Sequence, residues 1–437
     1  MLLRIIYGLA FLGFSFQISA LEDWEARHLL MRTGFEPSNQ ELSQFKELNR
    51  KQAISKILKG FTEPVSNLPE WHNQIEKKKR KGLSDEERKQ LQKQRRQRVL
   101  ELKGWWFREL IQTQNPLQEK MTLFWHNHFT SSIQKVKEPY LLLKQNQLLR
   151  KHSLGSFSTL LHEISKDPAM ILYLDNQTNK KGNPNENFAR ELLELFTLGI
   201  GHYTEEDIKE AAKAFTGYQV NRKSGEFVLR YNLHDHSKKK FLGVEGHRLI
   251  GEDIIEILLS KKQTARHITA KILKEFISYE LPARVVEKFV TDFQTNKFDL
   301  AKLVRSILSS EQFWSQKNYQ TMIKSPVELI VGLFRSNPVE ISMLEDFKPV
   351  VQASRVMGQD IFNPPTVKGW EGGTKWITTH TYLARRQSLS RFIKHGMEMR
   401  RMSMGNPKLM GKKMKAKMQT EMREMRTALL SEEYQLK

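Results

Sequence analysis

Helical periodicity constrains the fold of this chain more than any other feature. Apolar residues recur at intervals of three and four over long stretches, which is the spacing that gives an α-helix one buried face. The sequence predicts helices over residues 23–33, from 39 past 58, from Ser84 onwards, and over 252–260, 264–279, 282–294, 299–309 and 325–336. We therefore expect a mainly α fold, a multi-helical single large domain.

Two segments depart from the helical pattern. Residues 218–229 place β-prone side chains on both sides of Ser224-Gly225, which predicts a small β-hairpin insertion. Residues 357–377, MGQDIFNPPTVKGWEGGTKWI, carry two prolines and three glycines near Trp370 and Trp376. This composition predicts an irregular Trp/Gly/Pro loop, and we take its two tryptophans as candidates for binding a substrate or partner.

The N-terminus has the layout of a secretory signal peptide. Arg4 precedes an apolar run over residues 5–16, and small residues follow at Ser19-Ala20. We expect residues 1–20 to be removed and the protein to be exported to the periplasm or the extracellular space. An uncleaved anchor is the alternative, although the run is shorter than the ~20 residues of a membrane-spanning helix. The chain has no cysteine, which excludes thiol catalysis and cysteine-based metal sites.

The chain is strongly basic, with a formal net charge of +22. Such a charge favours an anionic partner, either a membrane surface or a glycan. The sequence shows no nucleic-acid-recognition motif, which argues against a nucleic acid partner. The charge is concentrated in a basic helical insertion at about residues 75–100, which is either a solvated helix face or an electrostatic dock. In the second case Arg95, Arg96 and Arg98 are the candidate partner-binding residues.

Residues 391–437 predict a basic, Met-rich C-terminal helix that follows the helical domain of residues 21–390. Nine of the sixteen methionines lie between Met397 and Met425, and several share one helical stripe. The stripe is typical of a packing face, because methionine adapts to irregular surfaces. A membrane-surface helix and a copper(I) site remain as alternatives.

One helix carries the strongest chemical signal. On a wheel of 100° per residue, its polar residues share one face and its apolar residues occupy the other. Carboxylates crowded around a single arginine would hold an ion or shift a pKa if another element covered them, but they are unremarkable in solvent. The candidate catalytic and substrate-binding residues on this face are Glu186, Asn187, Arg190, Glu191 and Glu194.

Histidines provide the other candidate ligands. His128 lies on the apolar stripe of its helix, as a core histidine or a functional one, and His126 points elsewhere. His234 and His236 would share one side of an extended segment, with Asp235 on the other. Imidazole and carboxylate groups suit a divalent metal, so these five residues are candidate metal ligands and His128 is also a candidate catalytic residue.

At these segments the sequence resembles the bacterial family called domain of unknown function 1800. The resemblance covers nearly the whole mature chain. The matching segments, in chain order, are LLMRTGFEPS, MTLFWHNHFTSS, HSLGSFSTLLHEISKDPAMILYLDN, NENFARELLELFTLGIGHYTEEDIKEAAKAFTGY, HDHSKKKFLG, TARHITAKILKEF, IKSPVELIVGLFR and MGQDIFNPPTVKGWEGGTKWI.

The resemblance implies a mostly helical, exported protein that acts beside a companion resembling the sulfatase and alkaline-phosphatase superfamily. It implies no reaction. Phe196 stands where the family pattern commonly has histidine, so we infer that position 196 is not indispensable to any shared chemistry. The family's recurrent pieces fall on Trp125 to Phe129, Glu186 to Leu195, and His234-Asp235.

Two functions follow from this sequence. The first is an assembly or binding protein of the envelope, in which the polar helix is structural and the basic stretches hold a partner. The second is a metal-assisted hydrolase of an envelope or exported polymer, in which the acidic helix meets His128 and the His234 to His236 segment and Arg190 binds an anionic substrate. The sequence slightly favours the first, because it contains no nucleophile motif, phosphate-binding loop or specific metal signature.

Overall fold

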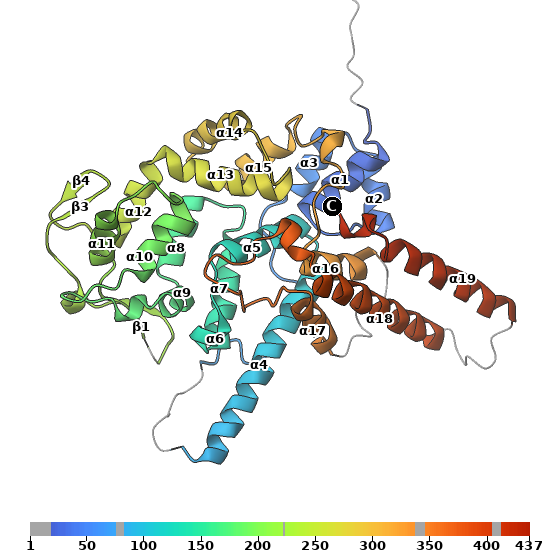
Figure 1. Ribbon diagram of the computed structural model, residues 1–437, viewed down its shortest axis with the longest axis horizontal. Coiled ribbons are helices and arrows are strands. Elements are labelled where there is room, and N and C mark those ends of the chain that lie inside the picture. Colours follow the sequence, from blue (N-terminus) through green and yellow to red (C-terminus); the bar gives the residue numbers. More distant parts are fainter. Residues whose placement is uncertain (1–18, 76–82, 222, 337–345, 404–411) are drawn as a thin grey trace, which may run out of the picture.

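Helices make up almost all of the regular structure, as the periodicity predicts (Figure 1). The computed structural model describes residues 19–75, 83–221, 223–336, 346–403 and 412–437. Most of the predicted signal segment lies outside these ranges. None of the helices in the described ranges is long and apolar enough to cross a membrane.

The first half of the chain builds the N-terminal and central helices. They are α1 (Asp23–Thr33), α2 (Asn39–Lys46), α3 (Arg50–Ile57), α4 (Asp85–Gln112), α5 (Pro116–His128), α6 (Ile133–Val136), α7 (Pro139–Lys151), α8 (Phe157–Ser165), α9 (Pro168–Tyr173), α10 (Asn187–Glu191), the π-helix η2 (Leu192–Thr197) and α11 (Glu205–Ala214).

The second half adds further helices and two small hairpins. The helices are α12 (Gly251–Ser260), α13 (Lys262–Phe276), α14 (Ala283–Thr295), α15 (Leu300–Leu308), α16 (Pro326–Ser336), α17 (Lys348–Val356), α18 (Thr379–Ser403) and α19 (Lys412–Leu429). The strands are β1 (Tyr218–Val220), β2 (Phe227–Leu229), β3 (Lys239–Phe241) and β4 (Val244–Gly246). Short 3₁₀ turns lie at η1 (Asn176–Thr178), η3 (Tyr231–Leu233), η4 (Gln316–Asn318), η6 (Gly373–Trp376) and η7 (Glu433–Gln435).

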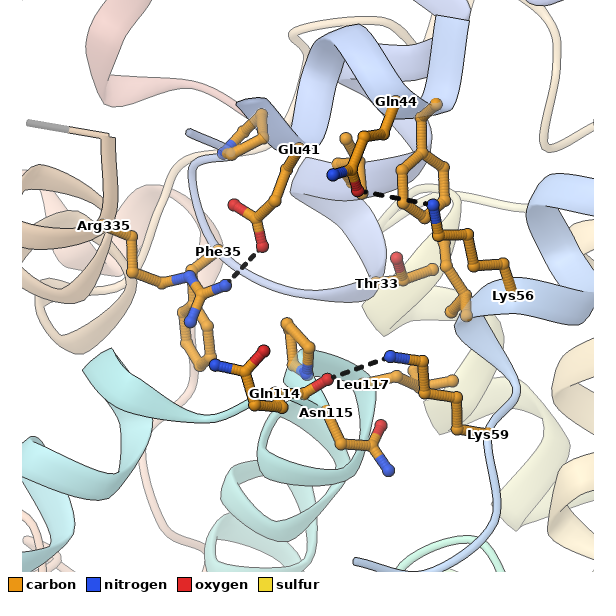
Figure 2. Close-up of a pocket in the computed structure, with 15 residues that line it drawn as sticks. Thr33, Phe35, Glu41, Gln44, Lys56, Lys59, Gln114, Asn115, Leu117 and Arg335 are labelled. Carbon is orange, nitrogen blue, oxygen red and sulfur yellow. Dashed lines mark hydrogen bonds and ion pairs between the residues drawn. The ribbon is translucent and has the colours of Figure 1, made fainter. Parts of the chain in front are cut away.

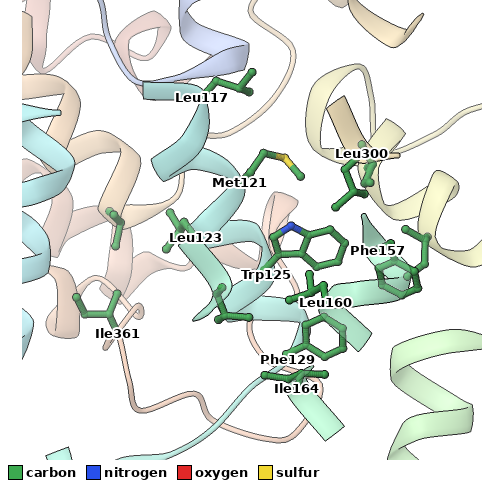
Figure 3. Packing of buried hydrophobic residues seen from close by; sticks show 14 of the residues in the cluster. Leu117, Met121, Leu123, Trp125, Phe129, Phe157, Leu160, Ile164, Leu300 and Ile361 are labelled. Atoms are coloured by element: carbon green, nitrogen blue, oxygen red, sulfur yellow. The ribbon is translucent and has the colours of Figure 1, made fainter. Parts of the chain in front are cut away.

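The core surrounds α5, which lies at the centre of the molecule (Figures 1 and 3). Trp125 is fully buried, and its ring stacks near Phe129 and Phe157 with centroids 5.7 Å from each. Its indole N–H donates to the Ser153 carbonyl at 2.9 Å, so the buried polar atom is satisfied. The apolar face that the sequence assigns to residues 117–128 is therefore the face that holds the core.

A buried ion pair joins α5 to α7. Arg150 donates to both carboxylate oxygens of Glu119, at 2.5 and 2.9 Å, and neither side chain is more than 1% exposed. Trp106 of α4 donates to the same carboxylate at 3.0 Å. Such two-pronged geometry satisfies both charges at once, which a buried pair requires. These contacts hold α4, α5 and α7 in fixed positions relative to one another.

The predicted second helix is two helices. The sequence predicts one helix from residue 39 past 58, but α2 ends at Lys46 and α3 begins at Arg50. Asn49 accepts a hydrogen bond from the Gln52 backbone N–H, and the Gln52 side chain accepts one from the Asn49 N–H. This capping box starts a new helix and interrupts the apolar periodicity.

Residues 85–100 of the basic insertion form the start of a 28-residue helix, α4, and residues 76–82 of the insertion lie outside the described ranges. The helix begins at Ser84 with the capping box to Glu87 that the sequence predicts. The N-terminal half projects from the body of the molecule (Figure 1), while its buried residues lie between Leu102 and Ile111. The insertion is thus continuous with the core and not a separate unit.

Two hairpins occur where the sequence predicts one. The expected pair, β1 and β2, aligns Tyr218 with Leu229. The second pair, β3 and β4, turns at Leu242 and Gly243, both with positive φ, and was missed because three-residue strands carry little alternation. The Asp207 side chain accepts a hydrogen bond from the Leu242 N–H at 2.8 Å and holds this turn against α11.

The tail also differs from its prediction. In place of one helix over residues 391–437, α18 begins at Thr379 and ends at Ser403, and α19 follows from Lys412. Met410 lies outside the described residues. Met425 is half-buried against the core, which agrees with a packing face at that position.

Arg335 fastens the N-terminal helices to the core beside a small cavity of about 140 Å³ (Figure 2). Its guanidinium donates to the carbonyls of Ile111 and Thr113, at 2.9 and 3.1 Å, and to the Glu41 carboxylate at 2.6 Å. One side chain of α16 therefore ties the end of α4 to α2. The cavity has no cluster of charged groups facing it beyond this clamp and two lysines, so we assign it a structural role.

Candidate functional site

The end of α5 and the Trp/Gly/Pro loop form one unit. His126 accepts a hydrogen bond at Nε2 from the Phe362 backbone N–H, at 3.0 Å. Asn127 accepts from the Trp370 N–H at 2.7 Å and donates to the Trp370 carbonyl at 3.0 Å, across 243 residues of sequence. Gly369 has a φ of +77°, and a Cβ there would lie 2.2 Å from the Asn127 side-chain oxygen. The close approach requires glycine at this position.

Two further contacts extend this seam, by which we mean the hydrogen bonds between residues 126–132 and the loop of residues 357–377. The Thr130 hydroxyl donates to the Val367 carbonyl at 2.6 Å, and the Ser132 hydroxyl donates to the Asn363 side chain at 3.0 Å. The loop that the sequence identifies as irregular is therefore ordered by polar side chains from residues 126–132, and it covers one side of a pocket.

This central pocket has a volume of about 320 Å³, which is sufficient for a small ligand. Aromatic side chains and lysines dominate its walls. The aromatic residues are Phe124, Tyr279, Trp370 and Trp376, and the lysines are Lys120, Lys271, Lys274, Lys368 and Lys437. His128 and three glutamates, Glu275, Glu328 and Glu371, complete its charged lining.

Two of the lysines are neutralised by buried carboxylates. Lys120 and Lys437 both pair with Glu275, at 3.0 and 3.1 Å, and both pair with Glu328. Burial raises the pKa of Glu275, but Lys437 and Lys120 outweigh burial and lower it to about 2. These four charges balance one another, so they contribute no net charge to the pocket.

Lys271 differs from those two lysines. Its ammonium donates to His128 Nδ1 at 3.0 Å and to the Leu195 carbonyl at 3.1 Å, and no carboxylate of the described residues forms an ion pair with it. Burial lowers the pKa of Lys271 to about 8, and neighbouring Lys274 adds to the shift. A largely buried cation without a counter-charge therefore lines this pocket.

One acceptor of Lys271, the Leu195 carbonyl, comes from an unusual helix end. The helix that starts at Asn187 widens into a π-helix over Leu192–Thr197, so the prediction of one regular α-helix is wrong for its second half. Its last carbonyls have no later backbone donor, and the Leu195 carbonyl instead accepts from His267 Nε2 at 3.0 Å as well as from Lys271.

His128 contributes to the same arrangement. Its Nε2 lies 3.3 Å from the Phe196 carbonyl, and its Nδ1 faces the Lys271 ammonium. Burial, with the charge of Lys271, lowers the pKa of His128 well below its usual range. The ring is therefore neutral, with its proton on Nε2 and its lone pair toward the lysine. His128 is a positioning residue at the pocket wall as well as a core residue.

The predicted acidic face exists, but its groups mostly satisfy one another. Arg190 donates to both oxygens of Glu205, at 2.9 and 2.8 Å, and to Glu186 at 3.1 Å. Hydrogen bonding to Glu205 raises the pKa of Arg190. Asn187 is exposed and reaches Asp175 at 3.4 Å. The predicted binding of an anionic substrate by Arg190 is not supported, because two carboxylates already occupy its donors.

Glu191, on the same face, has a shifted pKa. Burial and the neighbouring Glu194 raise the pKa of Glu191, while Lys368 opposes the shift. Lys368 also lines the central pocket, so Glu191 lies close to the covering loop. Glu194 accepts a hydrogen bond from the Tyr203 hydroxyl at 3.0 Å.

The predicted metal ligands are dispersed. His234 is buried and bonds to the Thr216 carbonyl at 2.8 Å, and His236 lies beside it with ring centroids 5.0 Å apart. Asp235 caps its own turn through Ser237. Within the described ranges, no three His, Asp or Glu side chains are grouped so that they could hold a metal ion. A metal site shared by the acidic helix, His128 and the His234 segment is therefore not formed among the described residues.

The basic candidates separate into two sets. Arg95 and Arg96 line a large groove between α4, α6 and α17. Arg98 faces elsewhere, with its guanidinium 5.8 Å from the Trp71 ring and a hydrogen bond to Gln74. The three arginines therefore do not form one patch.

Sequence reasoning missed the lysines of the pocket. Lys120 follows Leu117 by three residues and precedes Phe124 by four, so it stands on an apolar helix face, and that position was an available signal. Lys271 lies inside a segment that carries the family resemblance, but only the fold shows that it has no counter-charge.

A family model described as "Protein of unknown function (DUF1800)" matches residues 28–435. The chain belongs to this family. No curated protein and no solved structure matches it. The family assignment thus covers the seam, most of the tail and all of the central pocket's lining residues except Lys437, and it assigns no activity to any of them.

The seam provides a stability test. We expect Gly369→Ala to lower the free energy of unfolding by about 3 kcal/mol, because it adds both left-handed backbone strain and a clash with Asn127. Urea unfolding followed by circular dichroism measures the change.

Gly182→Ala is the matched control, because Gly182 has a φ of +79° and open space around its missing side chain. This variant should lower the free energy of unfolding by about 1 kcal/mol. Equal losses for the two variants would show that the contact with Asn127 is not important.

Proposed function

We propose that this protein is an exported binding protein of the cell envelope whose central pocket holds an acidic saccharide. The observation that carries the proposal is Lys271, a largely buried cation that faces a pocket and has no carboxylate partner among the described residues. A buried charge without a counter-ion is costly, and an anionic ligand would remove that cost.

The aromatic wall favours a saccharide over a simple anion. Trp370, Trp376, Phe124 and Tyr279 line the same pocket as the lysines. The apolar C–H faces of a sugar ring pack against aromatic rings, while its carboxylate or sulfate group accepts hydrogen bonds from an ammonium. The volume of about 320 Å³ suits one or two sugar rings.

Export and the companion protein belong to the same proposal. The leader-like pattern of residues 1–20 supports export, and the net charge of +22 supports an anionic surface or glycan as the environment. The sulfatase-like companion implied by the family resemblance would act on the polymer that this protein holds.

Binding of a galacturonate disaccharide tests the proposal. We expect Lys271→Gln to weaken binding by about 10- to 100-fold, because a charge-assisted hydrogen bond contributes about 1.5–3 kcal/mol. Isothermal titration calorimetry measures the affinity, and the neutral galactose disaccharide should bind the wild type weakly.

Lys302→Gln is the control for loss of one positive charge, because Lys302 is exposed and does not line the pocket. It should bind like the wild type. Unchanged binding by Lys271→Gln would refute the assignment of Lys271.

The affinity should also depend on pH. The saccharide carboxylate stays ionised above pH 6, whereas Lys271 loses its proton as the pH rises through about 8. We therefore expect the association constant to fall between pH 7 and pH 9, and Lys271→Gln to reduce this dependence. If the association constant falls equally with pH in the wild type and in Lys271→Gln, a group other than Lys271 causes the pH dependence.

A metal-assisted hydrolase is the second candidate, and the raised pKa of Glu191 favours it, because a carboxyl group with a raised pKa keeps its proton to a higher pH and can serve as a general acid. New reducing ends from galacturonate oligomers, with and without added Mg²⁺, Ca²⁺ or Zn²⁺, measure this activity. Glu191→Gln should lower the rate at least 100-fold, and the exposed Glu206→Gln should not. If the wild type releases no product, the hydrolase candidate is rejected and binding is the one function that stands.

A further inference from the structure

A second, larger groove lies along the projecting half of α4. Its volume is about 840 Å³, and α4, α6 and α17 form its walls. Six of its fourteen lining residues are lysine or arginine, and one is acidic. The groove is separate from the central pocket, with which it shares no lining residue.

The charges in the groove are not balanced from within. Its one carboxylate, Asp360, already pairs with Lys103, and both side chains are mostly buried. Arg96 on α4, Lys137 after α6 and Arg355 on α17 are exposed, and none forms an ion pair with a described residue. Three walls therefore present cations to the same space.

Aliphatic side chains alternate with these cations. Leu91 and Val99 of α4 lie eight residues apart, so they are two turns apart on one helix face, and Ile133 of α6 lines the opposite wall. No aromatic side chain lines the groove in the described ranges. This lining has no aromatic ring on which a sugar ring could stack, and a hollow of this volume fits an inserted segment better than a flat membrane surface.

We propose that this groove docks an acidic amphipathic helix of a partner protein. Leucine-type side chains of the partner would pack between Leu91, Val99 and Ile133, and its flanking carboxylates would meet Arg96, Lys137 and Arg355. A second copy of this chain is a poor occupant, because its net charge of +22 is of the same sign as the groove. The sulfatase-like companion is one protein that could supply such a helix.

A synthetic peptide of three heptads, with leucine at the a and d positions and glutamate at most others, tests the docking. The full chain should bind it, and Arg96→Glu combined with Arg355→Glu should weaken binding by about tenfold or more, since both charges become repulsive. Fluorescence anisotropy measures the affinity. Both arginines are exposed, so circular dichroism should show an intact fold.

Lys89→Glu combined with Lys93→Glu is the matched control. Both lysines are exposed on the same helix and outside the groove, and the change in net charge is identical. This variant should weaken binding less than about threefold. Equal weakening by the two variants would show general charge attraction and overturn the proposal.

Three further binding experiments distinguish between the candidate ligands of the groove. The same peptide with glutamine in place of glutamate should not bind. A heparin fragment and phosphatidylglycerol vesicles should bind less tightly than the acidic peptide, and their binding should not depend selectively on Arg96 and Arg355. If the Arg96→Glu and Arg355→Glu variant selectively loses heparin binding, the groove is assigned to a glycan instead. If it selectively loses vesicle binding, the groove is assigned to a lipid. Lys271→Gln should bind the peptide normally, so this result is independent of the proposed function.

Discussion

The architecture around the pocket depends on a network of four charges, of which three are buried and Glu275 is partly exposed. Lys120 of α5, Glu275 of α13, Glu328 of α16 and the side chain of Lys437 share two carboxylates between two ammonium groups. Elements from four parts of the chain must therefore be in place before all of these charges are satisfied. Removal of one member would leave an uncompensated buried charge, a loss of about 3–5 kcal/mol. All four side chains line the pocket, so this network holds that part of the pocket wall in place.

The balance of that network also makes Lys271 distinctive. Because Lys120 and Lys437 are neutralised by Glu275 and Glu328, they add little attraction for an anion. Lys271 instead relies on the lone pair of His128 and the Leu195 carbonyl, which stabilise an ammonium group without cancelling its charge. Similar residue types in one pocket thus have different roles, set by whether a carboxylate is within reach.

The sequence predicts much of the fold and less of the site. Apolar periodicity gives the helical class, the capping box at Ser84 gives the start of α4, and the turn at Ser224-Gly225 gives the first hairpin. These signals are local. The pairing of Asn127 with Trp370 joins positions 243 residues apart, and no local pattern specifies it. His126 illustrates the same limit, because its imidazole makes it a candidate metal ligand but its Nε2 accepts a hydrogen bond from the Phe362 backbone N–H.

The π-helical segment has a consequence for how this region of the chain can vary. A π-turn contains one residue more than an α-turn, so the positions of Leu195 and Phe196 relative to Glu191 depend on the number of residues between them. Loss of one residue there would restore α-helical hydrogen bonding, and it would move the Leu195 carbonyl away from His267 and Lys271 and the Phe196 carbonyl away from His128. The number of residues in this stretch therefore matters as much as the identity of its buried side chains.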